Sequence, residues 1–550
     1  MAIVKNPILR GFNPDPSICR AGDDFYIAVS TFEWFPGVLI YHSKDLVNWK
    51  LVAKPLNRVS QLDMRGNPSS GGIWAPCLSY DNGVFYLIYT DVKEWRGFNS
   101  WTPFKDAHNY LVTTTDITGD WSEPIYLNSS GFDPSLFHDD DRKWFVNMKW
   151  NYRVGANPFD GILLQEYDPE QKKLVGPIKN IFKGTDIGVT EGPHLYKRNG
   201  YYYLLTAEGG TSYKHSVTLA RAKNIDGPYE VHPENPILTS WNNPKLPIQK
   251  AGHASICEGK DGYWYMVHLG GRPLNKGKGF EKLLQIGKDL DGEEIRGVCP
   301  LGRETSIQRF EWKEDNWLYH VSGKNEPELE IEFKGIEKLE EIKEFYDNFE
   351  DEKLAIYFQS LRIPAENFAT LNERKGYLRL YGQESLTSKF NQSVIARRQQ
   401  SFKYIAETAV EFYPEDLQQM AGLLVKYNED NQYYLRVTYD EIKNIRTLGI
   451  LKFDDGFFEM PFGNDEIEVP NDVKLIHLKV EVNEEKLYFS YSFNGIDFIK
   501  IDIEFDSTIL SDEYAWPMGF TGAFVGMACQ DMSGRRKYAD FKYFKYVELD

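Results

Sequence analysis

Cysteine is scarce in this chain of 550 residues, which contains only five. No two cysteines have the CxxC spacing of a zinc site or redox motif, and an odd number does not suit a disulfide framework. Disulfides also belong to oxidising compartments. We therefore expect buried free thiols and a cytoplasmic location. The five residues are Cys19, Cys77, Cys257, Cys299 and Cys529.

Positive charge is also in deficit, because 63 Lys and Arg residues face 81 Asp and Glu residues and leave a net charge of −18. So acidic a chain repels phosphate backbones and anionic lipid, which excludes nucleic acid and membrane surfaces as expected partners. No stretch approaches the roughly 18 consecutive apolar residues of a membrane-spanning helix. The opening MAIVKNPILRG also lacks the apolar core of a signal peptide.

Aromatic residues are abundant by contrast, with 34 Tyr, 34 Phe and 13 Trp making up 15% of the chain. One interpretation is packing within β-rich domains, because aromatic rings suit pleated surfaces. The other is a sugar-binding site, in which flat rings cover the apolar faces of pyranoses. Composition alone favours the first interpretation.

One segment type recurs five times within residues 1–320, as in NPDPSICRAGDDFYIAVST and EGPHLYKRNGYYYLLTAEGG. Each copy has a small or proline-containing start, a short apolar strand, a polar turn and an aromatic-rich strand. The copies align at positions 60, 58, 59 and 61 residues apart, namely Asp15, Ala75, Asp133, Gly192 and His253. About 60 residues holding four short strands form one propeller blade. The sequence therefore predicts a five-bladed β-propeller over residues 1–320.

Three acids share nearly the same phase of this repeat. Asp15 and Asp133 occupy the aligned position, and Glu191 precedes it by one residue. Because the innermost strand of each blade lines the propeller axis, these side chains should meet at one end of the channel. Such convergence raises the pKa of at least one carboxyl group. One acid alone would most simply cap a turn, but three at one phase indicate a functional pocket. His253 adds only a weak signature of a metal cage.

Paired carboxylates beside aromatic residues are typical of glycoside hydrolysis, in which one acid protonates the leaving oxygen and another activates water. The chain has no Walker loop, no GxSxG and no HExxH motif. The glycine-rich EGG at Glu208–Gly210 and LGGR at Leu269–Arg272 are interpreted as turns. A non-catalytic sugar-binding propeller remains the alternative from another class.

The composition changes after residue 320. Residues 321–353 carry a dense run of Glu, Lys and Asp that we interpret as a solvated connector. Residues 354–550 alternate in the manner of strands joined by Asn, Asp and Gly turns, which predicts an all-β sandwich. The sandwich could bind polysaccharide, or it could complete the pocket and form an oligomer contact.

Several segments resemble β-xylosidases of glycoside hydrolase family 43: GFNPDPS, STFEWFPGV, GGIWAPCLSY, SSGFDPSLFHD, TEGPHLY, AGHAS and CPLGRETSIQ. The later YGQESLTSKF, IARRQQSF and FTGAFVGMACQDMSG resemble the C-terminal sandwich of those enzymes. The resemblance implies a five-bladed propeller followed by a concanavalin-like or jelly-roll sandwich. It further implies inverting, exo-acting release of D-xylose from the non-reducing ends of xylo-oligosaccharides. It requires no organic cofactor, and it favours a homo-oligomer in which the sandwich completes the pocket.

The resemblance also assigns roles to the three acids. Asp15 in NPDPS matches the general base that activates water, and Glu191 in TEGPHLY matches the general acid. Asp133 in FDPS matches the third acid, which orients the general acid and adjusts its pKa. The repeat alignment selects the same three residues without reference to the family.

Further residues resemble the family's substrate-binding positions. Arg303 in PLGRET should contact the sugar and the base, and His253 should lie near the bottom of the channel. Trp74 and Phe32 should wall the sugar subsites, although either could be ordinary core. Phe520 should reach in from the sandwich, with Phe524 as its rival. The full set is Arg303, His253, Trp74, Phe32 and Phe520.

Three further points rest on the same likeness. Asp347 and Asp540 could share a structural calcium ion between the sandwich edges. Gly192 stands where the family commonly has alanine. The segment 273–296 is longer and more charged than expected and could alter the leaving-group subsite. A β-xylosidase is the leading interpretation. An α-L-arabinofuranosidase, or an enzyme with both activities, is the alternative, because both sugars present a similar ring and the same three acids serve either.

Overall fold

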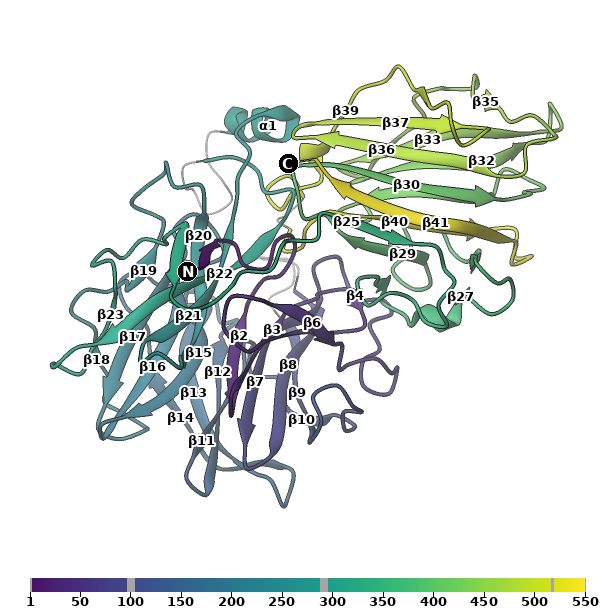
Figure 1. Ribbon diagram of the computed structural model, residues 1–550. Helices are drawn as coiled ribbons and strands as arrows, with labels where there is room; N and C mark the ends of the chain where they lie inside the picture. The colour runs from purple at the N-terminus through teal and green to yellow at the C-terminus, as the bar shows by residue number, and fades with distance from the viewer. Residues whose placement is uncertain (1, 96–103, 287–294, 516–518, 550) are drawn as a thin grey trace.

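The computed structural model describes residues 2–95, 104–286, 295–515 and 519–549, and its regular secondary structure is almost entirely β-strand. A propeller occupies the lower part of Figure 1 and a sandwich the upper right. The all-β propeller-plus-sandwich fold predicted from the sequence is confirmed. Within the described ranges there is one α-helix, α1 (Gly277–Ile286), and no helix there is long and apolar enough to cross a membrane.

Five antiparallel sheets form the blades. Blade 1 holds β2 (Ser17–Ala21), β3 (Asp24–Val29), β5 (Leu39–Ser43) and β6 (Lys50–Ala53). Blade 2 holds β7 (Gly72–Asp81), β8 (Val84–Glu94), β9 (Asp106–Thr114) and β10 (Ile125–Asn128). Blade 3 holds β11 (Ser135–Asp139), β12 (Arg142–Trp150), β13 (Phe159–Asp168) and β14 (Lys173–Phe182). Blade 4 holds β15 (Glu191–Arg198), β16 (Tyr201–Glu208), β17 (Ser216–Ala222) and β18 (Glu230–Val231), with β19 (Leu238–Thr239) also paired to β17. Blade 5 holds β20 (Gln249–Glu258), β21 (Trp264–Gly271), β22 (Arg303–Trp312) and β23 (Leu318–His320).

The hairpins follow the local sequence. Asn82-Gly83 joins β7 to β8 and Asn199-Gly200 joins β15 to β16, with both residues of each pair at positive φ. Such pairs form the two-residue turns whose twist matches that of antiparallel strands. The alternating aromatic and β-branched residues then direct one face of each blade into the apolar layers between blades.

The five aligned repeat positions share one backbone conformation. All five aligned residues adopt positive φ: 52° at Asp15, 35° at Ala75, 56° at Asp133, 57° at Gly192 and 44° at His253. Four of the five are not glycine, so this conformation carries strain that the surrounding packing must hold. The ladder register shifts beside this position in blades 2, 4 and 5. Such irregularities re-aim side chains, here at the same end of these three innermost strands.

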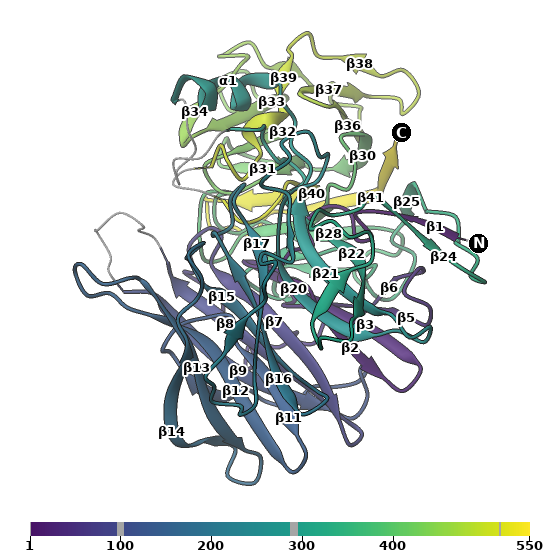
Figure 2. The same ribbon diagram turned by 90° about the vertical axis from the view of Figure 1, so that its left-hand side faces the viewer.

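The N-terminal segment closes the ring by running along blade 5. Strand β1 (Ala2–Lys5) pairs with β24 (Glu330–Phe333), and the two lie side by side in Figure 2. The Asn6 side chain donates to the Ile307 carbonyl at 2.8 Å and accepts from the Ile307 amide at 2.9 Å. Blade 5 is thereby tied to the chain that enters blade 1.

The sandwich consists of two antiparallel sheets that enclose a large apolar core. The first holds β25 (Glu344–Asp347), β27 (Ala369–Thr370), β28 (Leu378–Tyr381), β30 (Lys403–Glu411), β36 (Ile476–Asn483), β37 (Lys486–Ser492), β38 (Ile499–Lys500), β39 (Phe505–Asp506) and β41 (Tyr538–Glu548). The second holds β29 (Ser393–Arg398), β31 (Gln419–Lys426), β32 (Gln432–Asp440), β33 (Ile445–Asp454), β34 (Phe457–Glu459), β35 (Ile467–Glu468) and β40 (Phe524–Asp531). Short 3₁₀ turns lie at Ala365–Asn367 and Ser507–Ile509.

The segment 321–353 is more than a solvated connector, because it contains β24 and β25. The first strand pairs with β1 beside the propeller and the second with β41 of the sandwich. The dense charge of this segment hides the short alternating pattern of each strand, such as the EIEF of β24.

The two domains also join through a small shared sheet. Strand β4 (Trp34–Phe35) of the propeller pairs with β26 (Ser360–Leu361) of the sandwich domain. The Trp34 ring stacks on Phe524 with centroids 3.7 Å apart. Helix α1 adds a further contact, since its Lys278 pairs with Asp454 at 2.5 Å. The sandwich is therefore fixed against the pocket end of the propeller.

Candidate active site

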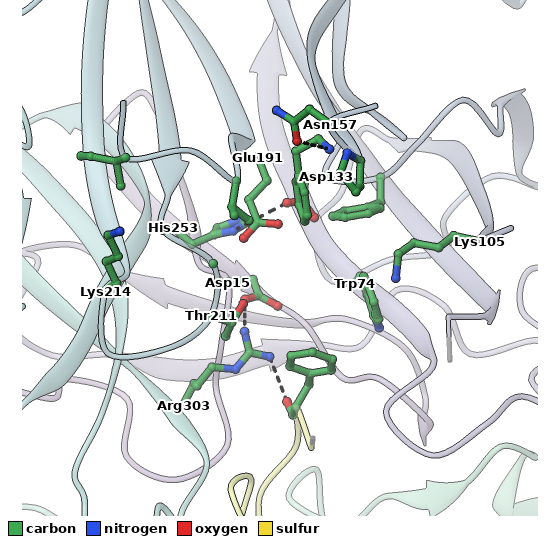
Figure 3. A pocket seen from close by; sticks show the side chains of 18 of the residues that line it. Asp15, Trp74, Lys105, Asp133, Asn157, Glu191, Thr211, Lys214, His253 and Arg303 are labelled. Carbon is green, nitrogen blue, oxygen red and sulfur yellow. Dashed lines mark hydrogen bonds and ion pairs between the residues drawn. The ribbon is translucent and has the colours of Figure 1, made fainter. Parts of the chain in front are cut away.

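A cavity of about 400 Å³ lies where the five innermost strands begin (Figure 3). Every blade contributes to its lining, and Phe520 of the sandwich domain reaches it as well. The structure brings Asp15, Asp133, Glu191, His253, Arg303, Trp74, Phe32 and Phe520 together around this single cavity. All eight residues proposed from the sequence thus lie where one small ligand could contact them.

Asp15 is held by two donors from neighbouring elements. Its Oδ1 accepts from Arg303 Nη1 at 2.7 Å, and its Oδ2 accepts from Ser30 Oγ at 2.6 Å. The Ser30 hydroxyl also accepts from the Ala75 amide at 2.8 Å, which connects blade 1 to blade 2. Asp15 is only 5% exposed. With a donor on each oxygen and a guanidinium partner, its surroundings suit a carboxylate that accepts protons.

Glu191 and Asp133 lie together in a different environment. Burial raises the pKa of Glu191 well above its ordinary value, and the charges of Asp133 and Asp15 raise it further against the opposing effect of Arg303. Burial likewise raises the pKa of Asp133 to about 6, with His253 opposing. The Gly192 amide donates to Asp133 Oδ2 at 3.1 Å. The charges of Arg303 and Lys105 oppose this effect without reversing it, so the raised pKa of Glu191 suits a group that donates a proton.

His253 lies beside this pair of acids. Its Nδ1 is 3.9 Å from Asp133 Oδ2, and the side chain is buried. Gly192 packs against the imidazole, so that an added Cβ would lie 3.1 Å from the ring. Glycine at this position therefore gives the histidine room that alanine would restrict.

Three rings form one wall of the cavity. Phe32 and Phe520 are nearly parallel, with centroids 6.3 Å apart, and Trp74 meets Phe520 edge-on at 5.7 Å. Phe524 instead packs behind the wall against Trp34. Of the two phenylalanines considered from the sequence, Phe520 is thus the one that lines the cavity.

Sequence analysis missed the lining residues that come from loops between outer strands. Lys105 is one: its ammonium lies 4.6 Å from the Trp150 ring centroid, and burial lowers its pKa to about 8. The EGG segment is interpreted above as a turn, but its Glu208 is the last residue of β16; Gly209 and Gly210, with φ of 85° and 71°, follow the strand and line the cavity. Other lining residues that the repeat gave no means to find are Asn157, Pro158, Phe159, Ile187, Val189, Thr211 and Lys214.

The described part of segment 273–296 does not line the cavity. Residues 287–294 of that segment lie outside the described ranges. Helix α1, which belongs to the segment, packs against the sandwich instead. The predicted influence of this segment on the leaving-group subsite stays a prediction.

The suggested calcium ligands have protein partners. Asp540 accepts from Arg374 at 2.9 Å and from Arg379 at 2.7 Å, whereas Asp347 accepts from the Phe349 amide at 2.8 Å. No group of three or more His, Cys, Asp or Glu side chains that could hold a metal ion occurs among the described residues. The calcium site also stays a prediction.

Comparisons with known proteins give a family match for each domain and similar proteins that span both domains. Residues 4–318 match "Glycosyl hydrolases family 43", and residues 346–547 match "Beta xylosidase C-terminal Concanavalin A-like domain". The chain is 55% identical to the beta-xylosidase of Bacillus subtilis (strain 168), with 99% of each chain covered. It is 49% identical to xylosidase/arabinosidase 43B of Humicola insolens, covering 99% of this chain and 98% of the other. The crystal structure of xylan beta-1,4-xylosidase from Bacillus halodurans C-125 matches with a TM-score of 0.91 and 51% identity, covering 99% of this chain and 100% of that one.

Proposed function

The chain belongs to glycoside hydrolase family 43, and from this premise we propose that it is an exo-acting, inverting xylan 1,4-β-xylosidase. Its reaction would release D-xylose from the non-reducing ends of xylo-oligosaccharides. The observation that carries the proposal is the contrast between two buried carboxyl groups in one cavity. Asp15 is paired with a guanidinium, whereas Glu191 sits among other acids with a raised pKa.

This contrast divides the chemistry of inversion between the two acids. As general base, the Asp15 carboxylate takes a proton from a water molecule as its oxygen attacks the anomeric carbon. As general acid, Glu191 gives its proton to the glycosidic oxygen as the bond to the leaving sugar breaks. The proton taken by Asp15 and the proton lost by Glu191 return through solvent between turnovers. Asp133 touches neither bond; its charge raises the pKa of Glu191.

The aromatic wall on one side of the cavity supports attack at a chain end. The wall formed by Phe32, Trp74 and Phe520 covers one side of the space beside Asp15. Arg303 lies between this wall and the base, with its Nη2 donating to the Phe520 carbonyl at 2.9 Å. We infer that a terminal sugar enters this cavity with its apolar face against the wall. Flat rings suit the apolar face of a pyranose, and the buried polar groups suit its hydroxyls.

An α-L-arabinofuranosidase activity, alone or alongside the first, is the second candidate. One relative, from Humicola insolens, is named a xylosidase/arabinosidase at 49% identity. The same base and acid would serve either sugar, because the leaving group and the attacking water have the same requirements.

The deciding measurement compares hydrolysis of 4-nitrophenyl β-D-xylopyranoside and 4-nitrophenyl α-L-arabinofuranoside, with the first xylose anomer identified by NMR. Rapid xyloside turnover giving α-xylose first is expected. Dominant arabinoside turnover would move the substrate assignment to the second candidate. Turnover of neither substrate would favour a non-catalytic sugar-binding propeller.

Replacement of the two acids tests their separate roles. Asp15→Asn should lower kcat by about 10²–10⁴ on every substrate, because water must always be deprotonated. Glu191→Gln should reduce hydrolysis of xylobiose by a similar factor but should affect the 4-nitrophenyl xyloside less, since nitrophenolate leaves with little protonation. Equal losses on both substrates in Glu191→Gln would contradict its role as the acid.

Location and assembly are further parts of this proposal. All five cysteines are free and buried, which suits a reducing compartment such as the cytoplasm. We propose a homo-oligomer, as the resemblance implies, and light scattering of the purified protein would test it.

A further inference from the structure

The aromatic wall is held from behind by residues 67–71, part of the connection between blades 1 and 2, which we call the wall loop. Trp74 Nε1 donates to the Ser70 carbonyl at 2.9 Å, and Trp95 Nε1 donates to the Ser69 carbonyl at 3.0 Å. The Phe520 amide donates to the Ser70 hydroxyl at 3.0 Å. Since the rings of Trp74, Trp95 and Phe520 contact one another, the position of this loop sets the position of the wall.

Ser70 occupies a backbone conformation that favours glycine. Its φ is 59°, and the residue is only 2% exposed. A serine here carries strain that glycine would avoid. Unlike glycine, serine has a hydroxyl group at this position, and this hydroxyl accepts a hydrogen bond from the Phe520 amide of the sandwich domain.

Buried charged residues from both domains hold the wall loop in turn. Glu33 Oε2 accepts from the Ser70 amide at 3.1 Å, and the Glu33 carbonyl accepts from the Arg362 amide at 2.9 Å. Arg362 donates through Nε to the Asn67 carbonyl at 3.0 Å and through Nη1 to Glu429 at 2.8 Å. The exposed fractions are 1% for Glu33, 2% for Arg362 and 3% for Glu429. We call these three residues the charge cluster.

The shared sheet between β4 and β26 places the cluster. Pairing of Trp34 with Leu361 makes Glu33 and Arg362 neighbours across the domain boundary. Lys426 adds a second cation, 3.9 Å from Glu429. Burying charges costs desolvation free energy that apolar residues of the same size would avoid. Stability alone therefore gives little reason for such a cluster, whereas a fixed geometry at the wall loop does.

We propose that Ser70 is a positioning residue for sugar binding, and that the charge cluster fixes it so that Phe520 and Trp74 close against the terminal sugar. This inference rests on the proposed function. Arg303 extends the connection to the reacting groups, because it donates both to the Phe520 carbonyl and to Asp15. The sandwich domain thus acts on substrate binding through the propeller's own loop as well as through the ring it supplies.

Ser70→Gly is the direct test, because it removes the hydroxyl while glycine accepts the backbone conformation. One lost buried hydrogen bond corresponds to about tenfold in affinity. We expect KM for 4-nitrophenyl β-D-xylopyranoside to rise about tenfold while kcat changes less than about threefold, because the wall contacts the sugar before and during reaction. The dissociation constant of D-xylose, followed by tryptophan fluorescence, should rise by a similar factor.

Asn82→Gly is the matched control. Asn82 also has positive φ, 48°, but lies in the turn at the other end of β7. This variant should keep the KM and the xylose affinity of the unaltered protein. A Ser70→Gly variant with unchanged KM and unchanged xylose affinity would overturn the inference, as would equal changes in both variants.

Glu429→Gln tests the charge cluster itself, since it keeps the side-chain shape and removes the charge that faces Arg362. It should raise KM in the same direction as Ser70→Gly. If it folds and leaves KM unchanged, the cluster has no positioning role; if it does not fold, Ser70→Gly decides. Should the unaltered protein hydrolyse no xyloside, the proposed function and this inference fail together. Normal hydrolysis with an unaffected Ser70→Gly variant would reject the inference alone.

Discussion

Asp15 and Glu191 are both buried carboxyl groups of one cavity, and their neighbours give them opposite tasks. Arg303 and Ser30 donate to the two oxygens of Asp15. Around Glu191 burial dominates, and the nearby charges of Asp133 and Asp15 add to its effect on the pKa. A carboxyl group with a raised pKa and a second carboxyl group held by a guanidinium, in one cavity, suit the acid and the base of one reaction.

Asp133→Asn gives a test at this scale that depends on the sign of one interaction. The charge of Asp133 raises the pKa of Glu191, so its removal should lower that pKa. The general acid works only while protonated, and activity is therefore lost as pH rises through the pKa of Glu191. We expect the alkaline limb of the kcat/KM profile for xylobiose to move to lower pH in the variant.

Asp139→Asn is a suitable control, because Asp139 lies at the far end of β11 and pairs with Lys197 on the surface. Its profile should coincide with that of the unaltered protein. An alkaline limb that stays in place, or moves to higher pH, in Asp133→Asn would show that Asp133 does not act through the pKa of Glu191.

At the scale of single elements, the entry to each innermost strand is the feature that places the site. Gly131 shows how closely the backbone packs there: a Cβ on it would lie 1.9 Å from the Met148 carbonyl oxygen. Two backbone hydrogen bonds hold the same segment, from Met148 to Phe132 at 3.1 Å and from Trp150 to Ser130 at 3.0 Å. The position of Asp133 depends on this contact between β12 and the segment before β11.

Gly131→Ala should therefore displace Asp133 as well as destabilise blade 3. Overpacking of this kind costs about 1–3 kcal/mol of folding free energy. We expect a lower denaturation midpoint and a kcat reduced at least about tenfold, measured on the fraction that remains folded. Gly119→Ala is the control, since the atoms nearest to its Cβ would belong to the exposed side chain of Asp116, at 3.2 Å and beyond. Unchanged kcat in Gly131→Ala would mean that the strand entry tolerates movement.

The repeat made the propeller and its three acids predictable from the sequence, because blades are local units and each contributes the same position to one axis. Asp15 and Asp133 share that phase, and both adopt the left-handed conformation in the structure. Lys105 and Thr211 could not be found in this way. They come from connections between outer strands, which differ in length from blade to blade and have no common register.

The contacts between the two domains could not be predicted from the repeat either. Phe520 entered the analysis only through the family resemblance, since an aromatic residue in a loop carries no sign of which cavity it will enter. The pairing of β4 with β26 joins segments more than 300 residues apart through two residues each. A strand of two residues is too short to show an alternating pattern, so this pairing could not be predicted from the sequence.

At the scale of the whole molecule, the two domains form one working unit because the pocket is completed across their interface. Lys250 at the start of β20 forms an ion pair with Glu513 of the sandwich domain, and their side chains are only 5% and 8% exposed. Glu513 also accepts from the Cys299 amide at 2.7 Å. A second buried connection joins the sandwich domain to the wall loop, because Arg362 Nε donates to the Asn67 carbonyl at 3.0 Å. The domains should consequently unfold in a single transition.

Glu513→Gln tests this unity, because it leaves the buried Lys250 charge without its partner. Removing one member of a buried pair costs about 3–5 kcal/mol, far more than an exposed pair provides. We expect calorimetry to show a clearly lower denaturation midpoint, with propeller and sandwich still unfolding in one transition. Glu415 is exposed, and Glu415→Gln removes a partner of Arg535 and Lys537, so it should leave the midpoint nearly unchanged. If Glu513→Gln instead separated the melting into two transitions with activity lost in the first, this ion pair would be what couples the domains. An unchanged midpoint would show that the aromatic and β4–β26 contacts hold the domains together without it.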